Sequence, residues 1–291
     1  MLACVRQKAG RTMVAMKKSA LHNKTLLQKG QYILLVAGSP QGVSTELLSE
    51  LADGATFTLG VDSGANLVHA AGLKLDYLVG DLDSVDDVAL AAYLADGCKV
   101  LAADAYKDET DLELAMVLAE SLPTDLLLTS QPSELGSALS SSELPSASPS
   151  SELSPVLLPV QDLSLVVTNA LGGRVDHELA VLGVLMRSVH LKPIIVEDGV
   201  MVVFLGAESV GDGENKARAQ LCINEVGAPL DTLVSVIALG GEALVSEMGF
   251  VWELDYVRLR PYDPRGVSNR VQSPGACITV HEGTVAVFLY S

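Results

Sequence analysis

Four short acidic clusters stand where an apolar run ends or where a helix is expected to begin. They are Asp62-Ser-Gly-Ala-Asn66, Gly80-Asp-Leu-Asp-Ser84, Lys107-Asp-Glu-Thr-Asp111 and Leu171-Gly-Gly-Arg-Val-Asp-His177. One such cluster is weak evidence of a site, because carboxylates also cap helices and solvate turns. Four of them, each beside a glycine or a helix start, indicate a site for magnesium and phosphate, and so a protein that handles a nucleotide.

The second cluster offers the clearest metal ligands. Asp81 and Asp83 follow the apolar run 77–79, and an extended backbone would direct both side chains to the same side. Mg²⁺ takes a few carboxylates and completes its octahedron with water and phosphate oxygens, which suits such a pair. The alternative is that Asp81 or Ser84 caps a helix beginning near Val85, and this motif alone leaves both interpretations open.

The third cluster begins a strong helical pattern over 110–122. Asp108, Thr110 and Asp111 need no catalytic explanation there, because acids and threonine are favoured at helix starts. Loops that follow parallel strands share one rim of the sheet, however, so Asp111 could supply a third carboxylate to the pair.

The fourth cluster combines Gly172, Gly173 and Arg174 between an apolar run and a helical pattern. Bare backbone N–H groups and a helix N-terminus can hold phosphate in this setting, and the arginine would add a fixed positive charge. The alternative is a plain Gly-Gly turn followed by a surface arginine.

Other catalytic motifs are missing from the sequence. It has neither the P-loop lysine motif nor Gly-x-Gly-x-x-Gly, which excludes a P-loop and a dinucleotide fingerprint. His69 and His177 are candidate bases only in principle, because a lone histidine near a helix start is more often structural. Without a Gly-x-Ser-x-Gly elbow or a persuasive Cys–His pair, we expect no covalent Ser or Cys intermediate.

The elements that must position these clusters follow a βαβ rhythm. Apolar runs at 32–37, 56–61, 77–79, 99–102, 125–129, 163–168 and 193–196 alternate with helical stretches at 44–52, 64–71, 85–94, 110–122 and 178–189. This rhythm predicts a doubly wound, mostly parallel α/β/α domain over residues 31–200, with ligands at the carboxyl ends of its strands. The Ser/Pro/Leu-rich segment 130–161 is predicted to be a disordered insertion in that domain.

After residue 201 the helical signal fades. Runs at 233–239, 276–281 and 284–290 lie between Gly, Pro and Asp turns and predict an antiparallel β domain over 201–291.

Composition limits the function further. The chain has 291 residues, 49% of them hydrophobic, and no apolar run approaches the roughly 20 residues needed to span a bilayer. The net charge is −17, and residues 1–45 hold seven Lys/Arg and no acid, so residues 46–291 are more acidic still. An acidic body repels nucleic acid, so we expect no nucleic-acid partner. The short apolar runs predict no membrane partner.

The N-terminus and the cysteines bear on location. Residues 1–30 are basic and acid-free and lack a long apolar core, which predicts a disordered extension and leaves an organellar transit segment open, but not a secretory signal. Four cysteines lie far apart with no Cys-x-x-Cys pair, so we expect them reduced and buried in a cytoplasmic protein.

Taken in order, the four clusters resemble those of the thiamine pyrophosphokinases. That family has Asp-Gly-(Gly/Ala)-Ala-Asn, Gly-Asp-Phe-Asp-Ser, an Asp-x-Thr-Asp helix start and Gly-Gly-Arg-x-Asp-His. The resemblance extends to Gly249-Phe-Val-Trp252-Glu-Leu254 and Gly266-Val-Ser-Asn269 and covers about residues 32–290. It leaves out the insertion and the basic N-terminus.

The resemblance implies a C-terminal β-sandwich, a homodimer, and transfer of pyrophosphate from ATP to thiamine with release of AMP. It also implies roles for the candidate residues. The catalytic set would be Asp81, Asp83, Asp108 and Asp111. Of these, Asp81, Asp83 and Asp111 would hold Mg²⁺, and Asp108 would be the weakest choice, as a base. The nucleotide pocket would comprise Asp62, Asn66, Thr110, Gly172, Gly173 and Arg174. Thiamine would meet Trp252, Ser268 and Asn269, at the interface with the second subunit.

Three departures from the family pattern bear on these roles. Ser63 replaces a glycine, and Leu82 replaces a phenylalanine, both tolerable if they only pack the turn. Arg270 stands where an acid often follows the Ser-Asn pair, which could alter the thiamine pocket or the dimer contact. Two alternative functions remain open: another magnesium-dependent transferase acting on a nucleotide-sugar, and a non-catalytic nucleotide or thiamine sensor.

Overall fold

The computed structural model describes residues 27–28, 32–103, 110–125, 163–207 and 218–291. Most of the basic extension 1–30 and the whole insertion 130–161 therefore lie outside the described residues. No helix in the described part of the chain combines the length and apolarity needed to cross a membrane.

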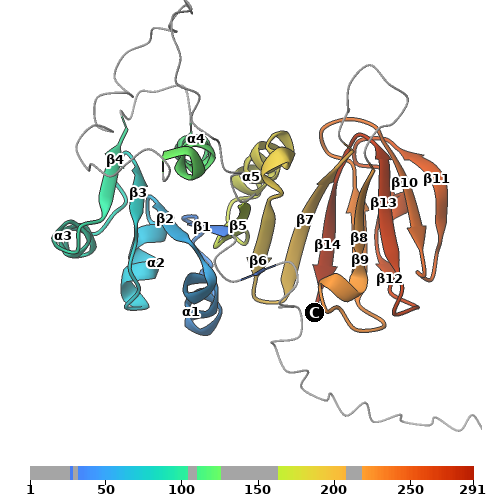
Figure 1. The fold of residues 1–291 in the computed structure, drawn as a ribbon, viewed down its shortest axis with the longest axis horizontal. Helices are drawn as coiled ribbons and strands as arrows, with labels where there is room; N and C mark the ends of the chain where they lie inside the picture. Colours follow the sequence, from blue (N-terminus) through green and yellow to red (C-terminus); the bar gives the residue numbers. More distant parts are fainter. Residues whose placement is uncertain (1–26, 29–31, 104–109, 126–162, 208–217) are drawn as a thin grey trace, which may run out of the picture.

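One ten-stranded sheet runs through the molecule in the order β12-β9-β14-β7-β6-β5-β1-β2-β3-β4 (Figure 1). Six of its strands are parallel: β1 (Tyr32–Val36), β2 (Phe57–Val61), β3 (Tyr77–Gly80), β4 (Lys99–Ala102), β5 (Ser164–Thr168) and β6 (Ile194–Glu197). Strand β1 is buried along its whole length, as expected for a strand covered on both faces. The predicted parallel sheet is thus confirmed.

The same sheet continues into the C-terminal half through antiparallel pairing of β6 with β7 (Val200–Gly206). It then adds β14 (Thr284–Tyr290), β9 (Leu233–Ile237) and the short β12 (Asn269–Arg270). The sequence patterns did not reveal this continuity, and the predicted boundary between residues 200 and 201 falls inside β7.

A second sheet has four antiparallel strands in the order β11-β10-β13-β8. They are β8 (Ala219–Cys222), β10 (Ala243–Met248), β11 (Leu254–Leu259) and β13 (Cys277–Glu282). Val245 and Ile278 of this sheet share one apolar core with Val236 and Val287 of the large sheet, so the C-terminal half is a sandwich of two sheets.

Helices cover both faces of the parallel part. Helices α1 (Thr45–Gly54), α2 (Gly64–Ala70) and α3 (Asp87–Ala95) pack on one face, in the apolar cluster that also fills the sandwich. Helices α4 (Asp111–Asp125) and α5 (Val175–Arg187) cover the other face (Figure 1). The predicted strand 125–129 is not confirmed, because Asp125 ends α4 and residues 126–129 lie outside the described part.

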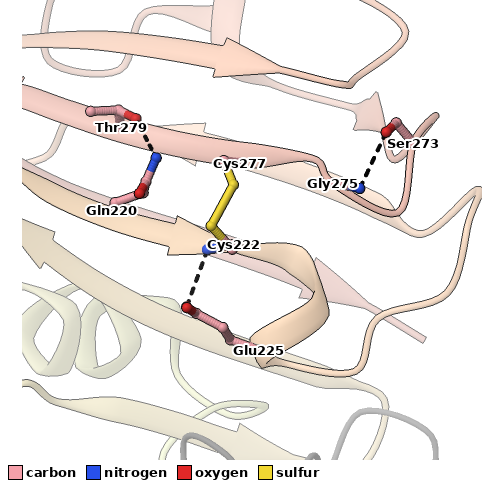
Figure 2. Close-up of a disulfide and its surroundings, with 7 residues drawn as sticks. All are labelled: Gln220, Cys222, Glu225, Ser273, Gly275, Cys277 and Thr279. Atoms are coloured by element: carbon pink, nitrogen blue, oxygen red, sulfur yellow. Dashed lines mark hydrogen bonds between the residues drawn. A yellow bond between two sulfur atoms is a disulfide. The ribbon is translucent and has the colours of Figure 1, made fainter.

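The cysteine prediction is wrong for one pair. Cys222 and Cys277 form a disulfide between β8 and β13 (Figure 2). They lie directly opposite each other in the antiparallel register, with their Cα atoms 4.2 Å apart, although 55 residues separate them in the chain. Spacing in the sequence could not reveal this pair, because strand pairing alone brings the two together. Cys98 is free and buried, as predicted, and Cys4 lies outside the described residues.

Candidate active site

The carboxyl ends of the parallel strands carry an unusual backbone. Asp62, Leu82 and Asn169 follow β2, β3 and β5, and all three have left-handed φ angles, of 46°, 67° and 56°. Non-glycine residues adopt this conformation at an energetic cost, and such strain concentrates at binding and catalytic sites. This edge of the sheet is where a doubly wound fold binds ligands.

Asp62 packs directly on the backbone of β3. A Cβ atom on Gly80 would lie 1.7 Å from Oδ1 of Asp62, and Gly80 itself has a φ of 144°. The backbone N–H of Asp62 donates to the carbonyl oxygen of Val79 over 3.0 Å. The first two clusters predicted from the sequence therefore lie side by side, and Gly80 is what allows the contact.

Asp81 and Asp83 lie together at the end of β3. The backbone N–H of Asp83 donates to Oδ1 of Asp81 over 3.1 Å. A side-chain hydrogen bond with Asp81 and the charge of Asp81 hold the pKa of Asp83 above its ordinary value, and burial and the charge of Asp111 act in the same direction. The three predicted metal ligands thus share one electrostatic environment.

These carboxylates do not form a complete metal site by themselves. Among the residues that the structure describes, no set of three or more Asp, Glu, His or Cys side chains is arranged to hold a metal ion. Asp81 and Asp83 form a pair, while Asp111 is near enough to influence the charge of Asp83 without joining a common set of ligands.

Asn66 links two of the clusters. Its Nδ2 donates to the carbonyl oxygen of Ser84 over 2.9 Å, and its Oδ1 accepts from the backbone N–H of Asp86 over 2.9 Å. Both ends of the amide therefore hold the loop that follows Asp83. This contact gives Asn66 a direct role in shaping the β3–α3 loop.

Thr110 caps helix α4. Its Oγ1 accepts from the backbone N–H of Glu113 over 3.2 Å, and Oε2 of Glu113 accepts from the backbone N–H and the hydroxyl of Thr110, both over 3.0 Å. This reciprocal arrangement is a capping box. The alternative explanation that the sequence offered for this cluster, a helix cap, therefore describes Thr110, and the predicted base Asp108 lies outside the described residues.

The Gly172-Gly173 turn already holds an anionic group. The backbone N–H groups of both glycines donate to Oε1 of Glu178, each over 2.9 Å. Gly172 has a φ of 83°, so its amide can turn toward this carboxylate. The predicted ability of this turn to bind an anion is thus realised within the chain, by a glutamate that the sequence analysis did not single out.

Arg174 is exposed and paired with its neighbour. Its Nη2 and Nε donate to the Asp176 carboxylate over 2.5 and 3.2 Å. The hydrogen bond from Arg174 lowers the pKa of Asp176 to about 2. The predicted positive charge is present at this edge, but it is partly neutralised locally.

Two further residues fix this edge, and the sequence analysis missed them. Ser39, after β1, donates its hydroxyl to the carbonyl oxygen of Leu171 over 2.7 Å. Nδ2 of the buried Asn169 donates to the carbonyl oxygen of Ala37 over 2.7 Å. These bonds join the loops after β1 and β5. A small polar residue within two positions of the end of each apolar run was the available signal.

Glu197, at the end of β6, is another residue that the sequence analysis missed. Its Oε1 accepts from the backbone N–H groups of Ala170 and Leu171 over 2.7 and 3.3 Å. Burial raises the pKa of Glu197 to about 7, against the lowering effect of these backbone bonds. A buried carboxylate thus fixes the start of the loop that contains the Gly-Gly turn.

The C-terminal candidates Trp252, Ser268 and Asn269 form a separate group, the Trp252 cluster. Asn269 is buried, and its side chain binds both the N–H and the carbonyl oxygen of Trp252, over 3.1 and 2.6 Å. The Trp252 side chain is 63% exposed, and Ser268 has a left-handed φ of 64°. Arg270, which departs from the family pattern, donates to the carbonyl oxygen of Asp231 over 2.9 Å.

The other two departures from the family pattern, Ser63 and Leu82, lie just after the carboxyl ends of β2 and β3. Leu82 packs against the main apolar cluster, as expected for a residue that only packs the turn. Ser63 lies at the start of α2, and its hydroxyl donates to the carbonyl oxygen of Gly38 over 3.4 Å.

The two clusters of candidate residues lie far apart within one chain. Asn269 is in β12, the outermost strand on one side of the large sheet, and Asp81 and Asp83 follow β3, the second strand from the opposite side (Figure 1). Eight inter-strand steps separate the two strands, roughly 38 Å at about 4.8 Å per step. The structure therefore places the residues predicted for the nucleotide along the carboxyl ends of the parallel strands and those predicted for thiamine in the sandwich half, and it does not bring the two sets together.

Comparison with known proteins assigns the chain to a family. The model of the family described as "Thiamin pyrophosphokinase, catalytic domain" matches residues 48–196, about half of the 291-residue chain. The chain belongs to the thiamin pyrophosphokinase family. The matched segment contains Asp62, Asp81, Asp83, Asp111 and the Gly-Gly-Arg turn, and it ends before the Trp252 cluster.

Solved thiamin pyrophosphokinase structures share the fold. The enzyme from Bacillus subtilis has a TM-score of 0.61 at 18% identity, covering 89% of this chain and 99% of the other. The yeast enzyme has a TM-score of 0.67 at 15% identity, covering 92% and 89%, and the Candida albicans enzyme 0.65 at 14%, covering 92% and 91%. No curated protein sequence gives a significant match to the chain. At these identities the structural likeness concerns the fold, which extends over both halves of the chain.

Proposed function

We propose that this protein is a thiamin pyrophosphokinase that transfers the diphosphate group of Mg-ATP to the hydroxyethyl group of thiamine, giving thiamine diphosphate and AMP. The observation that carries the proposal is the hydrogen-bonded pair Asp81 and Asp83 at the carboxyl end of β3. The pair lies in the segment that matches the family's catalytic domain.

The residues at this edge fit a magnesium ion. Carboxylate oxygens are the ligands that Mg²⁺ prefers. The hydrogen bond with Asp81 and then the charge of Asp81 raise the pKa of Asp83, and a bound cation would offset the repulsion between the two carboxylates. Asp81 and Asp83 would hold the ion, with Asp111 as the third carboxylate. When bound, Mg²⁺ would neutralise charge on the transferring phosphates. A pair or trio of carboxylates suits this role, because Mg²⁺ usually keeps positions for substrate oxygens and water.

The remaining residues at this edge would position ATP. Arg174 is exposed at the start of α5 and would exchange its pairing with Asp176 for a phosphate. The backbone N–H groups of Gly172 and Gly173 would donate hydrogen bonds to a phosphate group once Glu178 withdraws. Asp62, fixed against Gly80, would define one wall of the nucleotide pocket. Much of the rate gain in phosphoryl-type transfer comes from such positioning.

The Trp252 cluster would receive thiamine. Trp252 is exposed and could stack on a flat aromatic ring, and a cationic ring gains further from the π face of an indole. Ser268 would form the polar wall beside it, and the buried Asn269 would hold the backbone of Trp252 in place. In this arrangement the guanidinium group of Arg270 would remain bound to Asp231.

A homodimer would complete the site. The roughly 38 Å between β3 and β12 is too long for one chain to bring ATP and thiamine together. In a two-fold dimer, the edge carrying Asp81 and Asp83 of one subunit would face the Trp252 cluster of the other. This arrangement would give two identical sites, each composed of both subunits.

One observation favours an alternative, a non-catalytic sensor of nucleotide or thiamine. The carboxylate of Glu178 already occupies both amides of the Gly-Gly turn. A protein held in this state would bind ligands without turnover. The sensor hypothesis predicts binding of ATP or thiamine that is unaffected by Asp83→Asn, and no product from the native protein.

The experiment that tests the proposal is turnover of thiamine with ATP, with and without Mg²⁺. Asp81→Asn and Asp83→Asn should each lower turnover by at least about a hundredfold, because they remove charge that holds the metal. Asp87→Asn, which removes an acidic residue from the first turn of α3, is the matched control and should retain nearly native turnover. Near-native activity of either Asp81→Asn or Asp83→Asn, with the melting temperature unchanged, would contradict the proposal.

A further inference from the structure

A buried carboxylate lies beneath the Trp252 cluster, and the proposed function does not use it. Glu247 of β10 is 0% exposed. Its Oε2 accepts from Nδ2 of Asn269 over 2.7 Å, while its Oε1 has no hydrogen-bond partner. Burying a carboxylate with an unsatisfied oxygen costs stability, so Glu247 contributes little to the fold beyond its bond to Asn269.

That bond completes the hydrogen bonding of the Asn269 amide. The two N–H groups serve Glu247 and the carbonyl oxygen of Trp252, over 2.7 and 2.6 Å. Oδ1 accepts from the backbone N–H groups of Trp252 and Arg270, over 3.1 and 2.9 Å. An asparagine offers two donors and two acceptor sites, so all of its capacity is in use.

Glu247 therefore helps to fix the orientation of this amide, together with the backbone groups of Trp252 and Arg270. If the amide were turned over, its oxygen would face the Glu247 carboxylate, and its NH₂ group would face two N–H donors. Both contacts are repulsive. Burial raises the pKa of Glu247 to about 7, but both the ionised and the protonated carboxyl leave an oxygen able to accept from Asn269.

The orientation of Asn269 in turn holds the loop between β10 and β11. Asn269 binds both backbone groups of Trp252, and the neighbouring N–H of Val251 donates to the carbonyl oxygen of Arg270 over 3.0 Å. The Trp252 side chain is 63% exposed. Its place is thus set chiefly through its backbone, by the strand that contains Asn269.

We propose that Glu247 is a positioning residue that acts through Asn269 to hold the Trp252 loop in the orientation that receives the flat, cationic ring of the acceptor substrate. This inference rests on the proposed function for the identity of the acceptor. The hydrogen-bond chain from Glu247 to Trp252 does not depend on it.

Two substitutions of similar size separate the hydrogen bond from packing. Glu247→Met removes the acceptor, and Glu247→Gln retains an oxygen that can accept from Asn269. We expect Glu247→Met to raise the KM for thiamine about tenfold, as for the loss of one buried hydrogen bond, with the KM for ATP unchanged. Glu247→Gln should restore the KM for thiamine to within about threefold of the native value. If Glu247→Met does not fold, Glu247→Leu, which is also apolar and of similar size, provides the same comparison.

Trp252 also offers a readout that needs no turnover, because it is the only tryptophan in the sequence. Time-resolved fluorescence anisotropy of the native protein should report a restrained indole. In Glu247→Met the amplitude of the nanosecond component should rise about twofold, and in Glu247→Gln it should remain native. Unchanged anisotropy and an unchanged KM for thiamine in Glu247→Met would overturn the inference.

A double mutant tests whether Glu247 acts through Asn269. The KM for thiamine of Glu247→Met combined with Asn269→Ala should equal that of Asn269→Ala alone, because the two residues belong to one chain of contacts. Multiplicative effects would overturn the inference. If the native protein formed no thiamine diphosphate while the anisotropy behaved as expected, the proposed function would fail, and the positioning of Trp252 by Glu247 would stand.

Discussion

Asp83 and Asn269 lie toward opposite ends of one continuous ten-stranded sheet. Asp83 follows β3 and Asn269 belongs to β12, eight strand steps away. The sheet is continuous because β6 and β7 pair as antiparallel neighbours, which joins the parallel half to the sandwich without a break. The continuous sheet keeps the two candidate clusters apart, so in the proposed dimer a site that uses both would draw them from different subunits.

This separation predicts that two inactive variants restore each other. Asp83→Asn and Trp252→Ala should each be nearly inactive alone. In an equal mixture allowed to exchange subunits, half of the dimers are mixed, and each mixed dimer retains one intact site of two. We therefore expect about a quarter of the native activity. The measurement is thiamine turnover before and after subunit exchange.

The control for this experiment pairs Asp81→Asn with Asp83→Asn. Both substitutions affect the same half of the site, so mixed dimers should contain no intact site and no activity should return. Failure of the first mixture to regain activity, with subunit exchange demonstrated, would contradict a site shared between subunits.

The contact between Asp62 and Gly80 predicts an intolerant glycine. In Gly80→Ala the new Cβ would approach Oδ1 of Asp62 to 1.7 Å, on a backbone with a φ of 144°. We expect a loss of about 3 kcal/mol or more in the free energy of unfolding, together with loss of turnover. Gly72→Ala is the control, since Gly72 has a φ of 68° with nothing within 4 Å of its Cβ position, and should cost about 1 kcal/mol. Equal losses in urea unfolding would contradict a specific role for the contact.

The sequence predicted the parts of the molecule that depend on local pattern. The fully apolar run of β1 and the alternation of strands and helices predict a doubly wound parallel sheet, which places Asp62, Asp81 and Asp83 on one edge. Strand pairing between distant segments leaves no such local signal. The Cys222–Cys277 disulfide and the continuous sheet depend on the register of β8 with β13 and of β6 with β7, which composition and periodicity do not encode.

Buried acids were also beyond the reach of the sequence analysis. Glu197 and Glu247 stand in apolar strand segments, where sequence alone does not reveal which face is covered or which amide lies opposite. Glu178 resembles an ordinary acid in the first turn of a helix. Its contact with Gly172 and Gly173 depends on a turn whose glycines were recognised but whose conformation was not.

The Glu178 contact predicts competition with ATP. In Glu178→Ala the amides of Gly172 and Gly173 become available, so the KM for ATP should fall about three- to tenfold. Glu178→Gln retains an oxygen for both amides but loses the charge, and should give an intermediate value. Steady-state kinetics at saturating thiamine provide the measurement. An increased KM for ATP in Glu178→Ala would mean that Glu178 orders the turn for ATP and does not compete with it.

The burial of Glu197 predicts a pH dependence of stability. Its pKa is raised from 4.5 to about 7, so over this range the folded protein keeps a proton that the unfolded chain has released. The stability that this proton contributes is fully present below about pH 4.5 and is lost as the pH rises through 7. Between pH 5 and pH 8 the native protein should therefore lose roughly 2 kcal/mol more than Glu197→Gln, which cannot ionise.

Urea unfolding of both proteins at pH 5 and pH 8 measures this difference. Glu46→Gln, a change at an exposed acidic residue in the first turn of α1, is the control and should follow the native protein. Parallel losses in the native protein and in Glu197→Gln would show that Glu197 titrates alike in the folded and unfolded states.

The central claim is transfer of an intact diphosphate group from ATP to thiamine. Its most direct test is quantitative analysis of the products formed from ATP, Mg²⁺ and thiamine, by separation of the nucleotides and mass spectrometry of the thiamine esters. We predict AMP and thiamine diphosphate in equal amounts. ADP with thiamine monophosphate, or no thiamine ester from folded, dimeric protein, would contradict the claim.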